Sequence, residues 1–208
     1  MEVDKKLLYT NTVYRLNTAK SLLAFADEAL KGGVYFKNLD KYKTAINYKN
    51  FQSIDFQTFC FNYLFENLRI TTFFENFLKA FLLLNGKVVH KIDTSKDKTL
   101  SKKQIKQPID ISEISDIEVL SENTIGISNL QKKAYCEVVQ INLDFIKMLN
   151  PIFKYRNNVH FYIGETISDG EKFIEIYEKI LKMSESNIDP TIKNIENIIS
   201  NLIPPKKT

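Results

Sequence analysis

Apolar residues recur at intervals of three and four along most of the chain, the spacing that predicts amphipathic helices. The first such stretch covers residues 4–30 and ends at Lys31-Gly32-Gly33, because glycine commonly follows the end of a helix. Residues 34–53 are rich in Tyr, Asn and Lys and lack this regular spacing. We expect mainly a loop there, with room for one short helix.

A second, longer helix is predicted from about Asp55 to Asn85. Asp55 is a suitable N-cap residue, and Asn85-Gly86 is typical of a helix C-terminus. Apolar side chains surround most of the circumference of this helix, which is the pattern of a helix at the centre of a bundle.

Helical spacing resumes in the C-terminal part of the chain. Ser128 and Gln131 have the spacing of a capping box, and the pattern continues to Leu149. Asn150-Pro151 interrupts it, so either the helix kinks there or a new helix begins and continues to Gly164. Both alternatives place the residues that follow Pro151 on a helix.

Two further helices are predicted near the C-terminus. Residues 168–171 have the spacing of another capping box and begin a helix that extends to about Met183. Asp189-Pro190 begins a last helix to about Leu202, since proline suits the first helical position. No stretch alternates between apolar and polar residues for long enough to predict a strand. We therefore expect a single all-α domain over residues 1–208, a bundle of about five substantial helices.

The bundle is interrupted by a long charged insertion at about residues 86–127. Residues 86–106 contain seven Lys and two Asp, whereas residues 110–122 contain five acidic residues and no Lys or Arg. One interpretation is a solvated loop, with one short helix, whose two halves partly neutralise each other. The alternative is that the lysines follow a phosphate backbone.

The composition is that of an ordinary globular protein, with 44% hydrophobic and 26% charged residues. The net charge of +4 is by itself no argument for nucleic-acid binding. Cys60 and Cys136 are too few for a disulfide framework or a zinc site, so we expect both to be reduced core residues. The N-terminus lacks the apolar core of a signal peptide, and no apolar stretch approaches the length of a membrane span, which predicts a soluble, cytoplasmic protein.

Few chemistries fit the sequence. A Gly-rich phosphate loop, a nucleophilic-serine elbow, paired CxxC motifs and HExxH are all missing from it. The chain has only two His, His90 and His160, and no carboxylates are spaced convincingly to complete a zinc site with them. We therefore expect no metal ion and no cofactor.

One short segment combines groups that could cleave RNA. Arg156 and His160 are four residues apart, so on a helix they share one face. Arg binds phosphate with two parallel hydrogen bonds, and His exchanges a proton near neutral pH. His160 could act as general base or acid, Arg156 could stabilise the charge on the phosphorane, and Asn157 could orient either group.

These residues resemble the motifs of the HEPN superfamily (higher eukaryotes and prokaryotes nucleotide-binding domain), and in particular those of its toxin/abortive-infection-like members. The family signature is Arg, four to six residues and then His, often with Asn directly after the Arg, and Arg156-Asn157 followed by His160 is similar to it. Residues 74–92 resemble the family's earlier helix, with Glu75 and Lys79 four apart, then an apolar run, a glycine and a His.

The resemblance implies an all-α bundle and a metal-independent endoribonuclease of a toxin–antitoxin or anti-phage defence system. It also implies RNA as substrate, a homodimer in which two Arg/His helices face one cleft, and an antitoxin or another defence protein as partner. Some members carry a Tyr two residues after the His that becomes adenylylated. Tyr162 occupies that position, and the alternative is an aromatic residue of the helix face.

The remaining candidate residues have two interpretations each. Glu75 and Lys79 either form an ordinary ion pair one helical turn apart or line the cleft near Arg156. His90 is expected to be a loop or cap residue, with contact to substrate as the alternative. Lys102 and Lys103 belong to the lysine-rich half of the insertion and would help to hold RNA.

Two other functions compete with the ribonuclease. Only three residues separate Arg156 from His160, one fewer than the usual minimum, which favours a catalytically inactive HEPN-like module that dimerises and binds a partner protein or nucleotide. The modest net charge and the acidic half of the insertion favour an unrelated helical regulatory or structural protein.

Overall fold

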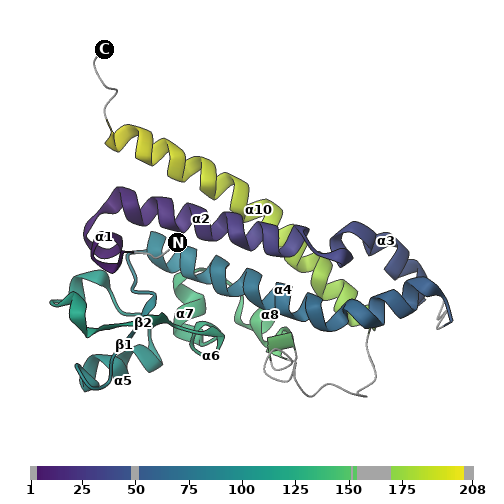
Figure 1. Ribbon diagram of the computed structural model, residues 1–208, viewed down its shortest axis with the longest axis horizontal. Coiled ribbons are helices and arrows are strands. Elements are labelled where there is room, and N and C mark those ends of the chain that lie inside the picture. Colours follow the sequence, from purple (N-terminus) through teal and green to yellow (C-terminus); the bar gives the residue numbers. More distant parts are fainter. Residues whose placement is uncertain (1–3, 48–51, 151, 154–169, 204–208) are drawn as a thin grey trace, which may run out of the picture.

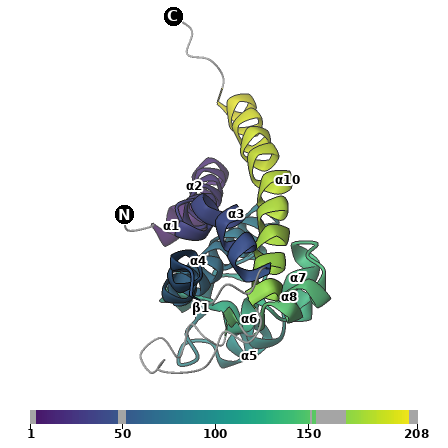
Figure 2. The same cartoon turned by 90° about the vertical axis from the view of Figure 1, so that its right-hand side faces the viewer.

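Long helices dominate the computed structural model, which describes residues 4–47, 52–150, 152–153 and 170–203 (Figure 1). Within these residues α2 packs against both α4 and α10, and α3 packs against α4 and α10 near one end of the bundle (Figures 1 and 2). The expected all-α helical bundle is thus confirmed. The four helices span Thr12–Lys31 (α2), Val34–Asn47 (α3), Ile54–Leu84 (α4) and Gly170–Leu202 (α10).

Shorter elements lie mostly on the other side of α4 from α2 (Figure 1). They form a two-stranded antiparallel sheet and a series of short helices. Their bounds are Lys5–Thr10 (α1), His90–Ile92 (β1), Lys98–Lys106 (α5), Ile111–Glu113 (η1), Ile117–Val119 (η2), Leu120–Thr124 (β2), Ile127–Leu130 (α6), Lys133–Val138 (α7) and Leu143–Met148 (α8).

The N-terminal helical stretch is two helices rather than the predicted one. Asn11 has extended backbone angles between α1 and α2, and its side chain accepts a hydrogen bond from Tyr14 N at 2.9 Å. Asparagine favours this N-cap geometry. Asn11 therefore begins α2, and its extended backbone separates α2 from α1. The predicted end at Lys31-Gly32 is confirmed.

Helix α3 occupies the region where the sequence pattern predicted mainly a loop. Its first turn is capped from a distant helix: Glu66 Oε1 of α4 accepts hydrogen bonds from Val34 N at 2.9 Å and Tyr35 N at 3.3 Å. Tyr35 and Tyr42 are then fully buried in an aromatic cluster with rings of α10. The prediction was wrong because the cap comes from tertiary structure, which local spacing does not reveal.

The central helix was predicted correctly to within one residue at each end. α4 ends at Leu84, and Gly86 adopts the left-handed conformation with φ of 67°, which glycine accommodates without a Cβ clash. Asp55 lies inside the first turn rather than at the N-cap. The C-terminal half of α4 is buried on several sides, as expected for a helix at the centre of a bundle.

The insertion is folded and is not a solvated loop. β1 and β2 pair in it, and the apolar residues Val88, Ile92 and Ile109 are buried in continuity with the main core. The strands were missed because three and five residues are too few to establish an alternating pattern. The expected neutralisation between its halves is confirmed by three ion pairs, Lys87–Asp110, Lys96–Glu118 and Lys103–Glu113.

Residues 127–148 form three short helices where one continuous helix was predicted. Gly126, not Ser128, is the N-cap of α6, and Gln131 lies at its C-cap, so no capping box forms there. Asn142 starts α8 by accepting a hydrogen bond from Asp144 N at 2.8 Å. Because Asn142 caps a new helix, the single helix that the apolar spacing predicted is divided at this residue.

The last helix is continuous, although two were predicted with a boundary at Asp189-Pro190. Pro190 lies inside α10, and Ile188 and Ile195 are buried on either side of it. Proline removes one backbone hydrogen bond, whereas packing along both halves of the helix holds it in register. Pro151 and Ser168, the other predicted boundary residues, lie outside the described residues.

Candidate functional site

The motif residues Arg156, Asn157, His160 and Tyr162 all lie outside the described residues. The described residues on either side of them are anchored in the core. Phe153 is buried, with its ring centroid 5.8 Å from that of Phe74 on α4. Phe173 of α10 is also buried, 5.5 Å from the ring of Tyr35. The described residues on both sides of the motif are therefore held by aromatic contacts in the core.

Glu75 and Lys79 form the ion pair that their spacing predicts, with 3.9 Å between Lys79 Nζ and Glu75 Oε2. Both side chains are largely buried, and both connect α4 to the insertion. Lys79 Nζ donates to Thr124 Oγ1 at 3.0 Å, and Glu75 Oε1 accepts from Ile127 N at 3.3 Å. The pair attaches β2 and the start of α6 to the central helix, and its role beside Arg156 stays a prediction.

Lys102 and Lys103 lie side by side in the sequence of α5 but in different surroundings. Lys102 is exposed, whereas Lys103 is bonded to Glu113, whose pKa falls below its usual value because of this contact. Lys87 and Lys96 are also paired with acidic residues. Much of the lysine-rich half of the insertion therefore faces its acidic half.

His90 lies in β1 and is only 6% exposed, so the expectation of a loop or cap residue was wrong. The hydroxyl of Tyr9 accepts hydrogen bonds from Val89 N and His90 N and lies 2.6 Å from His90 Nδ1. An oxygen that accepts twice still has its own proton, which it donates to Nδ1. Burial lowers the pKa of His90 to about 4, with a further contribution from Lys5, and raises the pKa of Tyr9 to about 12. His90 is thus neutral at pH 7 and joins α1 to β1.

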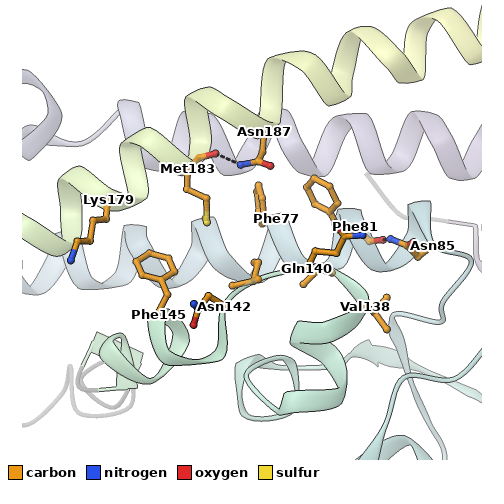
Figure 3. Close-up of a pocket in the computed structure, with 12 residues that line it drawn as sticks. Phe77, Phe81, Asn85, Val138, Gln140, Asn142, Phe145, Lys179, Met183 and Asn187 are labelled. Atoms are coloured by element: carbon orange, nitrogen blue, oxygen red, sulfur yellow. Dashed lines mark hydrogen bonds between the residues drawn. The ribbon is translucent and has the colours of Figure 1, made fainter.

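Helices α4 and α10 and the turn between α7 and α8 line a cavity of about 570 Å³ that opens to solvent (Figure 3). Much of its wall is aromatic or apolar. The rings of Phe77 and Phe81 lie 4.7 Å apart, and Phe145 and Met183 face them from α8 and α10 (Figure 3). A volume of this size accommodates a small molecule or one nucleotide.

Five polar side chains complete the cavity wall. Four are carboxamides, from Asn85, Gln140, Asn142 and Asn187, and the fifth is the ammonium of Lys179 (Figure 3). The sequence analysis missed this site because the residues come from three separate segments and form no motif. Only the fold brings them together.

Reactive groups are few elsewhere in the described residues. Cys136 is a free, buried cysteine, as predicted, and burial raises the pKa of its thiol. The side chain of Cys60 is outside the described part of the chain. Within that part, no cluster of three or more His, Cys, Asp or Glu could hold a metal ion, and no helix is long and apolar enough to cross a membrane.

Comparison of the chain with models of known protein families, with curated protein sequences and with solved structures gives no match.

Proposed function

We propose that this chain is a metal-independent endoribonuclease of a toxin or anti-phage defence system. The observation that carries the proposal is the motif Arg156-Asn157 followed by His160 in an all-α bundle. The bundle is the fold that the resemblance to the HEPN superfamily implies. The order of the elements also agrees, because the long helix with Glu75 and Lys79 precedes the motif.

The chemistry needs only the side chains of the motif and the RNA itself. His160 removes the proton from a 2′-hydroxyl, whose oxygen attacks the adjacent phosphorus. Arg156 stabilises the additional negative charge on the phosphorane. The bond to the 5′-oxygen then breaks, and that oxygen takes up a proton from a protonated His. The products are a 2′,3′-cyclic phosphate and a 5′-hydroxyl.

A homodimer fits this chemistry, since one Arg and one His make a small active site. Two copies that face one cleft supply two proton-transfer groups and two phosphate-binding groups. An antitoxin or another defence protein would then act by covering the cleft or by modifying a residue such as Tyr162.

The test compares the wild-type chain with Arg156→Ala and His160→Ala on total RNA and transfer RNA in the presence of EDTA. We expect cleavage by the wild type and a loss of at least about 100-fold in each variant, the range associated with general acid–base groups. Arg15→Ala is the matched control, because Arg15 lies on α2 and, among the described residues, its side chain bonds only to Thr12, three positions earlier. Equal cleavage by wild type and both variants would refute the proposal.

An inactive HEPN-like module is the second candidate, favoured by the three-residue spacing between Arg156 and His160. On a helix this spacing rotates His160 by about 100° relative to the next longer arrangement. Absence of cleavage by all proteins, together with a dimer in solution, would support this candidate and direct attention to its partner protein or nucleotide.

A further inference from the structure

We propose that the cavity between α4, α10 and the α7–α8 turn binds a nucleobase, carried by a free nucleotide or by a single RNA strand. The inference is independent of the cleavage chemistry, because it rests on described residues alone and is tested with ligands that cannot be cleaved. Flat apolar walls and convergent carboxamides are the two features that recognition of a base requires.

The aromatic walls supply the contact for the face of a ring. Phe77 and Phe81 lie on successive turns of α4, and Met183 faces them from α10 (Figure 3). Phe145 extends this surface from α8 (Figure 3). Such side chains attract the π-face of any base and give affinity with little discrimination among bases.

Three of the carboxamides use one polar atom in a hydrogen bond within the protein, which leaves the other polar atom available to a ligand. Asn85 Nδ2 donates to Phe81 O at 2.8 Å, and Asn187 Nδ2 donates to Met183 O at 2.7 Å. Asn142 Oδ1 caps α8. Among the described residues, no group bonds to the Oδ1 atoms of Asn85 and Asn187 or to Nδ2 of Asn142. Asn85 and Asn142 are exposed and Asn187 is half-buried, so the cavity offers two acceptors and one donor along a wall that solvent reaches, which suits a base that bears an exocyclic amino group.

Gln140 has a backbone conformation that its side-chain type disfavours. Its φ is 56°, at the position of a Schellman motif where glycine is usual, with Gln140 N bonded to Glu137 O and Ile141 N to Cys136 O. No described residue bonds to its carboxamide, which lies at the wall of the cavity (Figure 3). Gln140 is exposed, so its carboxamide is accessible to a ligand that enters the cavity, and such a contact would account for the strained backbone at this position.

Lys179 provides a charge for the phosphate of the nucleotide. It forms an exposed ion pair with Glu175 at 2.6 Å, the kind of pair that contributes little stability and is easily exchanged. Lys179 lies at the opposite end of the cavity from Asn85 and Val138 (Figure 3). A base among the carboxamides would thus place its phosphate toward the ammonium group.

Calorimetric titration with AMP, CMP, GMP and UMP tests the proposal, with a hexamer of deoxyadenosine as the uncleavable strand. We expect AMP, CMP or GMP to bind at least about tenfold more tightly than UMP, since uracil has no amino group for the two acceptors. If the hexamer binds and the mononucleotides do not, the ligand is a strand. Absence of binding by every probe, or equal affinity for all four mononucleotides, would overturn the proposal.

Substitutions at position 140 separate a ligand role from a structural one. We expect both Gln140→Gly and Gln140→Ala to weaken binding about tenfold, the effect of one lost hydrogen bond. Gln140→Gly should also raise the melting temperature, because glycine relieves the backbone strain, whereas Gln140→Ala keeps that strain. Gln107→Ala is the matched control, as an exposed glutamine outside the cavity. Unchanged affinity in both position-140 variants would contradict the proposed role of Gln140.

Discussion

At the scale of single residues, a neutral histidine holds the N-terminal helix to the insertion. Tyr9 donates to His90 Nδ1 and accepts from Val89 N and His90 N at the start of β1, so one buried phenol satisfies three groups. Lys5 and Lys79 make protonation of His90 still less favourable, while Glu122 opposes them. Sequence spacing could not reveal this role, because the partner lies 81 residues away.

The depressed pKa of His90 predicts how stability depends on pH. The unfolded chain binds a proton near pH 6.5 and the folded chain only near pH 4, so stability falls as the pH decreases between these values. The loss amounts to about 3 kcal/mol at pH 4 and below. The chain has only two His, so in the variant His160→Gln a single imidazole remains for NMR titration. We expect no titration near pH 6.5, and a midpoint there would show that His90 is solvated.

Gly33 is a second residue whose identity the tertiary structure explains. A Cβ atom at this position would lie 2.6 Å from Glu66 Oε2, on the carboxylate that caps α3. Burial raises the pKa of Glu66, so this carboxylate depends on its backbone donors and on Arg69 to stay charged. Displacement of the carboxylate would break the hydrogen bonds that Glu66 accepts from the backbone N–H groups in the first turn of α3.

We therefore expect Gly33→Ala to lower the free energy of unfolding by about 1–3 kcal/mol, the usual effect of overpacking. Gly126→Ala is the matched control, because nothing lies within 4 Å of a Cβ atom built there. We expect Gly126→Ala to lower the free energy of unfolding by no more than about 1 kcal/mol, because it changes an N-cap residue alone. Urea denaturation measures both variants, and equal losses would contradict the proposed contact.

At the scale of elements, periodicity predicted the helices whose ends are encoded locally. The C-termini of α2 at Lys31 and of α4 at Leu84 follow from the glycine and asparagine residues after them. The start of α4 was predicted to within one residue, although Asp55 lies in its first turn and is not its N-cap. The start of α3 was missed because Glu66 of α4 caps it, and the sheet was missed because its strands are short. The cavity could not be predicted at all, since its carboxamides are scattered between positions 85 and 187.

Helix α10 provides a test at this scale. Pro190 lies within it, between the buried residues Ile188 and Ile195, and lacks the N–H that a helix interior uses. We expect Pro190→Ala to raise the free energy of unfolding by about 1–3 kcal/mol, because alanine restores the hydrogen bond and has a higher helix propensity. If a helix instead began at residue 190, proline would suit that position and its replacement would give no gain.

At the scale of the whole molecule, the charged insertion belongs to the core rather than to the solvent. Its apolar residues join the main hydrophobic cluster, and three of its lysines, Lys87, Lys96 and Lys103, pair with its own acidic residues. Glu75 and Lys79 then attach it to the central helix. The fold class could be predicted from the sequence because helical periodicity extends over most of the chain. The motif at residues 156–160 rests on sequence alone.

The most direct measurement uses an RNA oligonucleotide that the purified wild-type chain cleaves, with EDTA present, and a copy with one 2′-deoxynucleotide at the cleaved position. Our account predicts cleavage of the all-RNA strand to a 2′,3′-cyclic phosphate and a 5′-hydroxyl, and no cleavage at that bond in the substituted strand. Cleavage of both strands, or products with a 5′-phosphate, would show that the 2′-hydroxyl is not the nucleophile and would contradict the account.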